Sequence, residues 1–139
     1  MNYINFFLFA IFFIFLIGII LYQIKEEFKP ESRDPVINKI KNKLRLVYPD
    51  IDRLEFYESN KSYTINKHKV HLCIKDKNGD YYNENMLTYV ALHELAHVLC
   101  DEIDHTDKFY EIFQNLLDKA SAMGLYDPDQ PVIQDYCEY

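Results

Sequence analysis

Seventeen consecutive residues, Phe6 to Tyr22, carry no charge and are almost wholly apolar. With Tyr3 and Ile4, the run approaches the roughly 20 residues that a helix needs to span the core of a bilayer. In lipid such a run can only be helical, because no water is present there to satisfy exposed backbone groups. The sequence therefore predicts that residues 3–22 anchor the protein in a lipid bilayer as a transmembrane helix.

The flanks of this run favour an uncleaved anchor over a signal peptide. No basic residue precedes it, no A-x-A cleavage site follows it, and it exceeds the usual apolar core of about 7 to 15 residues. Lys25, Lys29 and Arg33 follow the run, whereas no Lys or Arg precedes it. The positive-inside rule then predicts a single-pass protein whose C-terminal domain is cytoplasmic.

The chain has three cysteines, Cys73, Cys100 and Cys137, at no zinc-finger spacing. An odd, widely spaced set of this kind is typical of small packing residues or of free thiols in a reducing compartment. We therefore expect buried or free thiols, in agreement with a cytoplasmic domain.

Residues 23–33 are charged, contain Pro30 and predict a linker. The remaining residues, 34–139, are enough for one compact domain and too few for two. Their apolar periodicity predicts an amphipathic helix from Asp34-Pro35 to about Tyr48, short strands near residues 51–57 and 69–75, a buried helix after Asn83, and a further helix from Phe109 to a stop at Gly124. The fold class is therefore α+β, with three main helices and a small sheet behind the transmembrane helix.

The most specific motif is His93-Glu94-Leu95-Ala96-His97, which has the pattern H-E-x-x-H. On a helix, residues four apart share a face, so His93 and His97 can each offer an imidazole nitrogen to one Zn²⁺. Glu94 then lies beside a metal-bound water and can take its proton as the water attacks a carbonyl. The alternative is chance, but two histidines and a glutamate on a buried helix need a partner that offsets their desolvation. The motif therefore predicts zinc-dependent hydrolysis of a protein or peptide substrate.

A catalytic zinc site typically has three protein ligands, so a third must come from elsewhere. The downstream candidates are Cys100, Asp101, Glu102, Asp104 and His105. Cys100 and Asp101 would lie roughly 10 to 12 Å from His93 along a continuing helix, which is too far for one ion. The acidic residues oppose the negative end of the helix dipole and indicate that the helix ends near them. His105 is the first good donor on chain that can turn back.

The pattern from His93 to His97, followed by His105 and Phe109 as H-x-x-x-F, resembles the zinc signature of the WLM and SprT-like metallopeptidases, which are relatives of the Spartan protease. It is similar, more closely, to short uncharacterised WLM-like proteins of large DNA viruses. The match covers about residues 63–115, although the connection from His97 to His105 is longer than in the WLM pattern. The resemblance implies a small zincin-like domain in which His93, His97 and His105 bind zinc and Glu94 is the general base. Because these similar proteins are viral, a virion membrane is a second candidate for the membrane that holds the anchor.

The net charge of −7 is unevenly distributed, because residues 35–79 have ten Lys and Arg against five Asp and Glu, whereas residues 80–139 have two against thirteen. The acidic total argues against strong nonspecific binding of nucleic acid. The basic half includes Lys39, Lys43, Lys67 and Lys69, which could approach phosphates or an anionic bilayer, although a solvated surface is the commoner explanation.

Two other functions compete with a peptidase. One is a zinc-binding structural or interaction protein of a membrane or virion, without turnover; the intact Glu94 argues against it. The other is a protease that acts on proteins crosslinked to DNA, against which the anchor and the acidic balance argue. For a peptidase, an analogy with zincins suggests that extended substrate pairs with the strand Lys69 to Lys75. His68 and His71, which flank or lie in that strand, are expected to face solvent.

Overall fold

A computed structural model describes residues 2–138 of the chain as two compact units, which adjoin in sequence between Pro30 and Glu31. Within the described residues, the first unit contains one helix. The second contains three α-helices, a short 3-10 helix and a three-stranded sheet. The second unit is therefore an α+β domain, as predicted.

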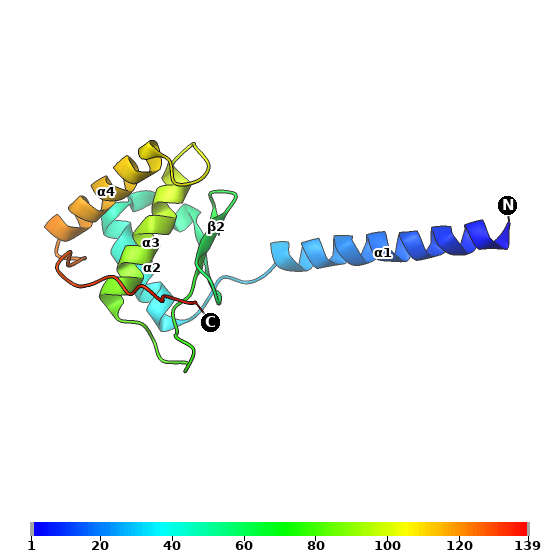
Figure 1. Ribbon diagram of the computed structural model, residues 1–139, viewed down its shortest axis with the longest axis horizontal. Coiled ribbons are helices and arrows are strands. Elements are labelled where there is room, and N and C mark those ends of the chain that lie inside the picture. Colours follow the sequence, from blue (N-terminus) through cyan, green and yellow to red (C-terminus); the bar gives the residue numbers. More distant parts are fainter. Residues whose placement is uncertain (1, 139) are drawn as a thin grey trace. The chain divides into compact units, whose positions relative to one another are not determined.

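The N-terminal helix, α1 (Tyr3–Glu27), is 25 residues long (Figure 1). Its stretch Tyr3–Lys25 is apolar and long enough to cross a membrane. At about 1.5 Å per residue this stretch covers about 35 Å, compared with about 30 Å for the hydrocarbon core of a bilayer. The helix continues past Tyr22 to Glu27, so the first part of the expected linker is helical.

The domain begins with α2 (Pro35–Val47), where the sequence predicts an amphipathic helix. The Asp34 side chain caps it by accepting a hydrogen bond from the backbone N–H of Val36 at 2.8 Å, and a proline occupies the first turn. Its buried face consists of Ile37, Ile40, Leu44 and Val47. A 3-10 helix, η1 (Pro49–Arg53), follows it and contains Ile51, which the apolar pattern had placed in a strand.

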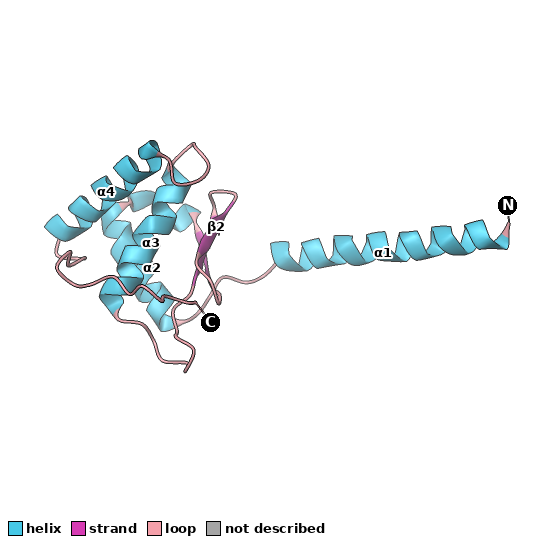
Figure 2. Cartoon of the chain, in the orientation of Figure 1, coloured by secondary structure: helices cyan, strands magenta, loops and turns pink. Residues whose placement is uncertain are grey.

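Three short strands form the sheet in the order β1-β3-β2. β1 (Glu55–Glu58) is parallel to β3 (Lys69–Leu72), and β2 (Tyr63–Ile65) is antiparallel to β3. The strand on which we expected substrate to pair is therefore the central one, with both edges occupied. That expectation is wrong, and the edge strand β2 instead contacts the helix α3 (Glu84–Leu99) (Figure 2).

His71 does not face solvent, contrary to our expectation. The residue is only 6% exposed, and its ring stacks between Tyr57 and Tyr63, with centroid distances of 5.0 and 4.4 Å. These three residues are direct cross-strand neighbours in β1, β3 and β2, a register that the sequence of one strand cannot reveal. His68 is exposed, as expected, with its Nε2 atom 3.2 Å from a carboxylate oxygen of Glu55.

Two further helices, α3 (Glu84–Leu99) and α4 (Asp107–Ala122), confirm the predicted helical segments. Asn83 and Thr106 cap their N-termini through side-chain oxygens. α3 lies between α4 on one side and the sheet on the other and also contacts α2, which makes it the central element (Figure 2). The core that surrounds it is completed by the side chains Ile37, Ile40, Leu44, Ile51, Phe56, Val70, Leu72, Ile74, Leu87, Ala91, Leu92, Leu95, Phe109, Phe113 and Leu116.

The cysteines are not all thiols. Cys73, just after β3, forms a disulfide with Cys137 in the C-terminal segment, 64 residues away, whereas Cys100 is buried and free. The prediction is confirmed for Cys100 and wrong for the thiol state of Cys73 and Cys137, because the irregular segment after α4 returns across the domain to the end of β3, and cysteine spacing does not reveal that path. The cysteines therefore no longer support a reducing compartment, because disulfides are typical of oxidising ones.

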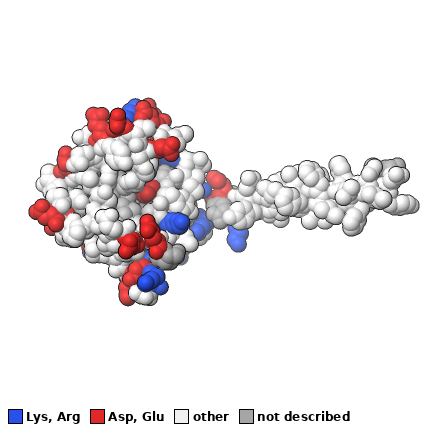
Figure 3. All heavy atoms as spheres, in the orientation of Figure 1, with Lys and Arg blue, Asp and Glu red and all other residues white. Residues whose placement is uncertain are grey.

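Some of the basic side chains of residues 35–79 form ion pairs with acidic side chains of the domain. Lys39 and Lys43 both contact Glu84 at the start of α3, where the Nζ atom of Lys43 lies 2.6 Å from a carboxylate oxygen. These lysines hold the pKa of Glu84 below its usual value. On the face seen in Figure 3, acidic side chains are spread over the domain, whereas α1 has uncharged side chains along most of its length.

Candidate metal centre

His93, His97 and His105 meet at one point. The first two lie one turn apart on α3, and His105 lies in the loop between α3 and α4. The Nε2 atom of His105 is 3.1 Å from that of His93 and 3.1 Å from that of His97. The three histidines can each offer one ligand atom within 4.8 Å of the others, so the cluster could hold a metal ion. For comparison, two nitrogens about 2.1 Å from a tetrahedral zinc ion lie about 3.4 Å apart.

Hydrogen bonds among the three histidines cannot satisfy all of their Nε2 atoms. A neutral imidazole has one N–H, so the Nε2 atom of His105 can donate to at most one of its two neighbours. Burial, followed by the neighbouring His97 and His105, lowers the pKa of His93 to about 4, and burial also lowers the pKa of His97. These two side chains are therefore neutral near pH 7 and present lone pairs, which is the form that binds metal ions.

Phe109 fixes the orientation of all three rings. It is fully buried in the first turn of α4, and its ring centroid lies 5.0 Å from that of His93, 4.3 Å from that of His97 and 4.8 Å from that of His105. Phe113, one turn later, packs edge-on against His93 at 5.2 Å. The spacing from His105 to Phe109 in the sequence therefore corresponds to direct packing at the site.

The loop that carries His105 is held from both sides. Its backbone turns at Asp104, which has a left-handed φ of 69°, and the following Thr106 caps α4. From the opposite side, the Nζ atom of Lys67 donates to the backbone carbonyls of His97, at 3.3 Å, and Cys100. Lys67 lies in the tight turn between β2 and β3, so the hairpin supports the C-terminal end of α3. The sequence alone indicated this lysine only as part of a basic surface.

The other candidates for the third ligand are less well placed. Cys100 is buried in the core, and Asp101 pairs with Lys108 at 2.6 Å. Glu102 and Asp104 line the same cavity as His105. Of the proposed donors, only His105 joins His93 and His97 in the cluster found among the described residues.

Glu94 lies beside the histidines in a buried position. It is 4% exposed, and its Oε2 atom accepts a hydrogen bond from the Oγ1 atom of Thr64 at 2.8 Å. Burial raises the pKa of Glu94 to about 7, although the hydrogen bond from Thr64 opposes the increase. Thr64 lies on β2, so the edge strand contacts the carboxylate directly. No motif in the sequence indicates this role of Thr64.

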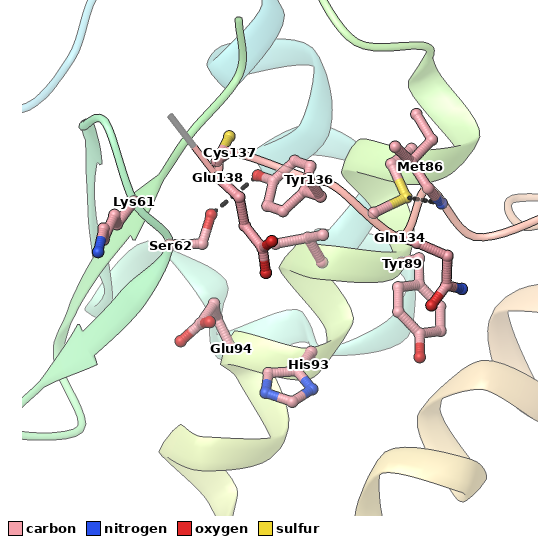
Figure 4. A pocket seen from close by; sticks show the side chains of 12 residues that line it. Lys61, Ser62, Met86, Tyr89, His93, Glu94, Gln134, Tyr136, Cys137 and Glu138 are labelled. Atoms are coloured by element: carbon pink, nitrogen blue, oxygen red, sulfur yellow. Dashed lines mark hydrogen bonds between the residues drawn. The ribbon is translucent and has the colours of Figure 1, made fainter. Parts of the chain in front are cut away.

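A cleft extends on both sides of His93 and Glu94. One half is a cavity of about 760 Å³ between α3, the residues before β2 and the C-terminal segment (Figure 4). The other half, of about 530 Å³, lies between β2 and the loop that carries His105. Both halves include Ser62, His93 and Glu94 in their walls. The histidines can therefore be approached from either half of the cleft.

Comparisons with known proteins identify relatives in viruses. The chain is 42% identical over 131 residues to Uncharacterized protein 136R of Invertebrate iridescent virus 6, a match that covers 78% of this chain and 73% of that protein. It is 51% identical over 87 residues to Uncharacterized protein 042R of Invertebrate iridescent virus 3, covering 62% of this chain and 55% of that protein. It is 34% identical over 99 residues to Uncharacterized protein R325 of Acanthamoeba polyphaga mimivirus, covering 66% of this chain and 47% of that protein.

The chain thus spans about half the length of the last two relatives and nearly three quarters of the first. No family model and no solved structure matches it. The identity with protein 136R, over most of both chains, establishes a common family. The chain therefore belongs to the viral protein family that includes Uncharacterized protein 136R of Invertebrate iridescent virus 6.

Proposed function

We propose that this protein is a membrane-anchored zinc metallopeptidase of the WLM and SprT-like type, with a zincin-like domain. The observation that carries the proposal is the meeting of three imidazole nitrogens beside a buried carboxylate in an open cleft. Three protein ligands with room for a fourth is the arrangement of catalytic zinc sites, whereas structural sites are closed. The relatives that the comparisons identify are viral proteins, and no activity is carried over from them.

In this proposal His93, His97 and His105 hold zinc through their Nε2 atoms. When bound there, zinc supplies a Lewis acid that lowers the pKa of water and polarises a peptide carbonyl. Glu94 accepts the proton of the attacking water and returns it to the leaving amine. Thr64 holds one oxygen of Glu94, which leaves the other for the proton. A carboxyl group with a pKa of about 7 can exchange a proton near neutral pH, and a nearby cation favours its ionised form.

The substrate that fits this cleft best is an extended segment of protein. β2 is an edge strand, and its Thr64 contacts Glu94. A peptide that pairs with the outer edge of β2 would pass the histidines, with side chains entering both halves of the cleft. This assigns to β2 the role that the sequence had suggested for the strand from Lys69.

The helix α1 is the proposed anchor in the lipid bilayer. Its length and composition suit a single span, and Lys25, Lys29 and Arg33 favour a cytoplasmic domain, or one inside a virion membrane. The disulfide between Cys73 and Cys137 favours an oxidising compartment instead. The charges act directly on membrane insertion, so we propose that the domain lies on the cytoplasmic side.

The proposed function is tested with the full-length chain in detergent micelles. We expect about one zinc ion per chain by elemental analysis, and cleavage of an unfolded protein that 1,10-phenanthroline abolishes and added zinc restores. Cleavage that survives removal of the metal would contradict the proposal. Full zinc loading without cleavage of any unfolded protein would favour the zinc-binding structural or interaction protein.

A further inference from the structure

The larger half of the cleft has a wall made by the C-terminal segment. Residues 133–138, called the C-terminal wall from here on, follow the irregular turn after α4 and lie over the N-terminal half of α3, opposite Lys61 and Ser62 (Figure 4). His93 and Glu94 form the end of the cavity nearest the proposed metal site. The cavity therefore has one wall from α3 and the residues before β2, and a second wall from a segment without regular secondary structure.

Several contacts fasten the C-terminal wall. The disulfide joins Cys137 to Cys73 at the end of β3. The hydroxyl of Tyr136 donates to the backbone carbonyl of Cys73 and lies 2.9 Å from the Oγ atom of Ser62. The backbone N–H of Cys137 donates to the hydroxyl of Tyr82 at 3.0 Å. The wall is therefore attached, covalently and by hydrogen bonds, to the segments that flank β2 and β3.

The two halves of the cleft are lined by different residues. The walls of the larger half carry the apolar or aromatic side chains of Met86, Tyr89, Val90, Ile133 and Tyr136, and charges occur there at Lys61, Glu94 and Glu138. The smaller half carries Tyr63 and Ile103, together with Lys67, Glu102, Asp104 and the two histidines, His97 and His105, that do not line the larger one. A volume of about 760 Å³ is within the usual range, about 300 to 1,000 Å³, of sites that enclose a small molecule.

We propose that the larger half is a binding site for a large apolar side chain of the substrate, next to the bond that is cleaved. The C-terminal wall, fixed by the disulfide, determines this specificity. The role of the bound group as part of a substrate rests on the proposed function, whereas the binding site itself requires no turnover. The pocket owes its shape to a segment far from H-E-x-x-H in sequence, which is why the motif alone gives no indication of it.

The test compares two small hydroxamates that differ only in one substituent, a benzyl group or a hydrogen, on the zinc-loaded full-length chain in detergent. The hydroxamate binds the metal in both, so the ratio of the two dissociation constants reports the side-chain site alone. We expect the benzyl compound to bind about tenfold more tightly or better, because burial of its ring removes apolar surface from water. Equal affinities would overturn the proposal.

Matched variants locate the site. Ile133→Trp fills the larger half and should abolish the preference for the benzyl compound, whereas Ile103→Trp, in the smaller half, should preserve it. The double variant Cys73→Ser, Cys137→Ser releases the C-terminal wall and should reduce the preference while zinc content stays the same. A preference that survives Ile133→Trp, or that disappears with Ile103→Trp, would contradict the assignment.

Cleavage assays on the same preparations separate this inference from the proposed function. If the benzyl preference behaves as expected and no protein is cleaved, the pocket is supported and the peptidase proposal fails. If proteins are cleaved and the two hydroxamates bind equally, the peptidase proposal stands and the pocket assignment fails.

Discussion

At the scale of single residues, the surroundings of the three histidines favour the form that binds metal. Burial lowers the pKa of His93 to about 4 and also lowers the pKa of His97. Near neutral pH, protons therefore do not compete with a metal ion for the nitrogen atoms of these two side chains. Phe109 packs against all three rings and restricts their rotation. The cluster is therefore oriented before a metal ion enters, which lowers the ordering cost of binding.

Removal of His105 tests the ligand set. We predict that His105→Ala weakens zinc binding far more than Cys100→Ala or Asp101→Ala, because only His105 brings a nitrogen to the other two histidines. Isothermal titration with zinc measures the affinities. If Asp104→Ala loses zinc while His105→Ala retains it, Asp104 is the ligand and our assignment is wrong.

The buried Glu94 should weaken the metal-free fold as pH rises. A glutamate carboxyl ordinarily has a pKa of 4.5, whereas that of Glu94 is about 7 in the fold, so between these values the folded state binds more protons than the unfolded state. Stability from this group therefore falls from about pH 4.5 to pH 7. With the metal removed by a chelator, the free energy of unfolding of Glu94→Gln should therefore increase relative to that of wild type as the pH rises through this range, by up to about 3 kcal/mol.

Urea denaturation at several pH values measures this difference. Glu111→Gln, on the exposed side of α4, is the matched control and should follow wild type throughout. A constant difference between Glu94→Gln and wild type from pH 4.5 to pH 7 would show that burial does not hold the proton on Glu94.

At the scale of elements, the site depends on an α-helix, a loop and a hairpin that meet. The helices were predictable, because α2 and α4 have a periodic apolar face, α3 is apolar on nearly all sides, and each has a capping residue next to it in sequence. His93, Glu94 and His97 lie on one such helix, so local sequence sufficed to bring them together. His105 required only that the helix end near Leu99, which the acidic residues after it indicated.

What the sequence did not show depends on contacts between distant segments. Thr64 and Lys67 reach the site because β2 lies beside α3, and strand order cannot be derived from strands of three or four residues. The same applies to the central position of β3 and the stacking of His71. The disulfide was missed because the segment that carries Cys137 has no periodic pattern that predicts where it packs.

The hairpin contact can be tested at Lys67. Its ammonium group donates to carbonyls at the C-terminal end of α3, where the helix dipole favours a positive charge. We predict that Lys67→Met lowers the free energy of unfolding by about 1 kcal/mol and weakens zinc binding, because the support of the loop with His105 is lost. Lys77→Met, in an exposed turn, is the control. Stability is measured by thermal unfolding, and an equal loss of stability in both variants would contradict this role of Lys67.

At the scale of the whole molecule, the chain combines a helix suited to a bilayer with a domain that has its own core. An anchor confines the proposed peptidase to substrates that reach the membrane surface, and it raises their effective concentration there. Carbonate extraction should leave the protein in the membrane fraction. Release into the soluble fraction would contradict the anchor.

The orientation of the domain is predicted by the charges after the anchor. Lys25, Lys29 and Arg33 should retain it on the cytoplasmic side, so an N-glycosylation reporter fused after Tyr139 should remain unmodified. Glycosylation of the reporter would show the opposite orientation. That result would agree with the disulfide between Cys73 and Cys137.

The most direct test of the peptidase proposal is the exchange of Glu94 for glutamine. This substitution preserves size but removes the ability to accept a proton, and Glu94 is not one of the three clustered ligands. For the zinc-loaded full-length chain we predict unchanged zinc content and a loss of about two to four orders of magnitude in the rate of cleavage of unfolded protein. Equal cleavage by wild type and Glu94→Gln, at equal zinc content, would contradict the role of Glu94 as the general base.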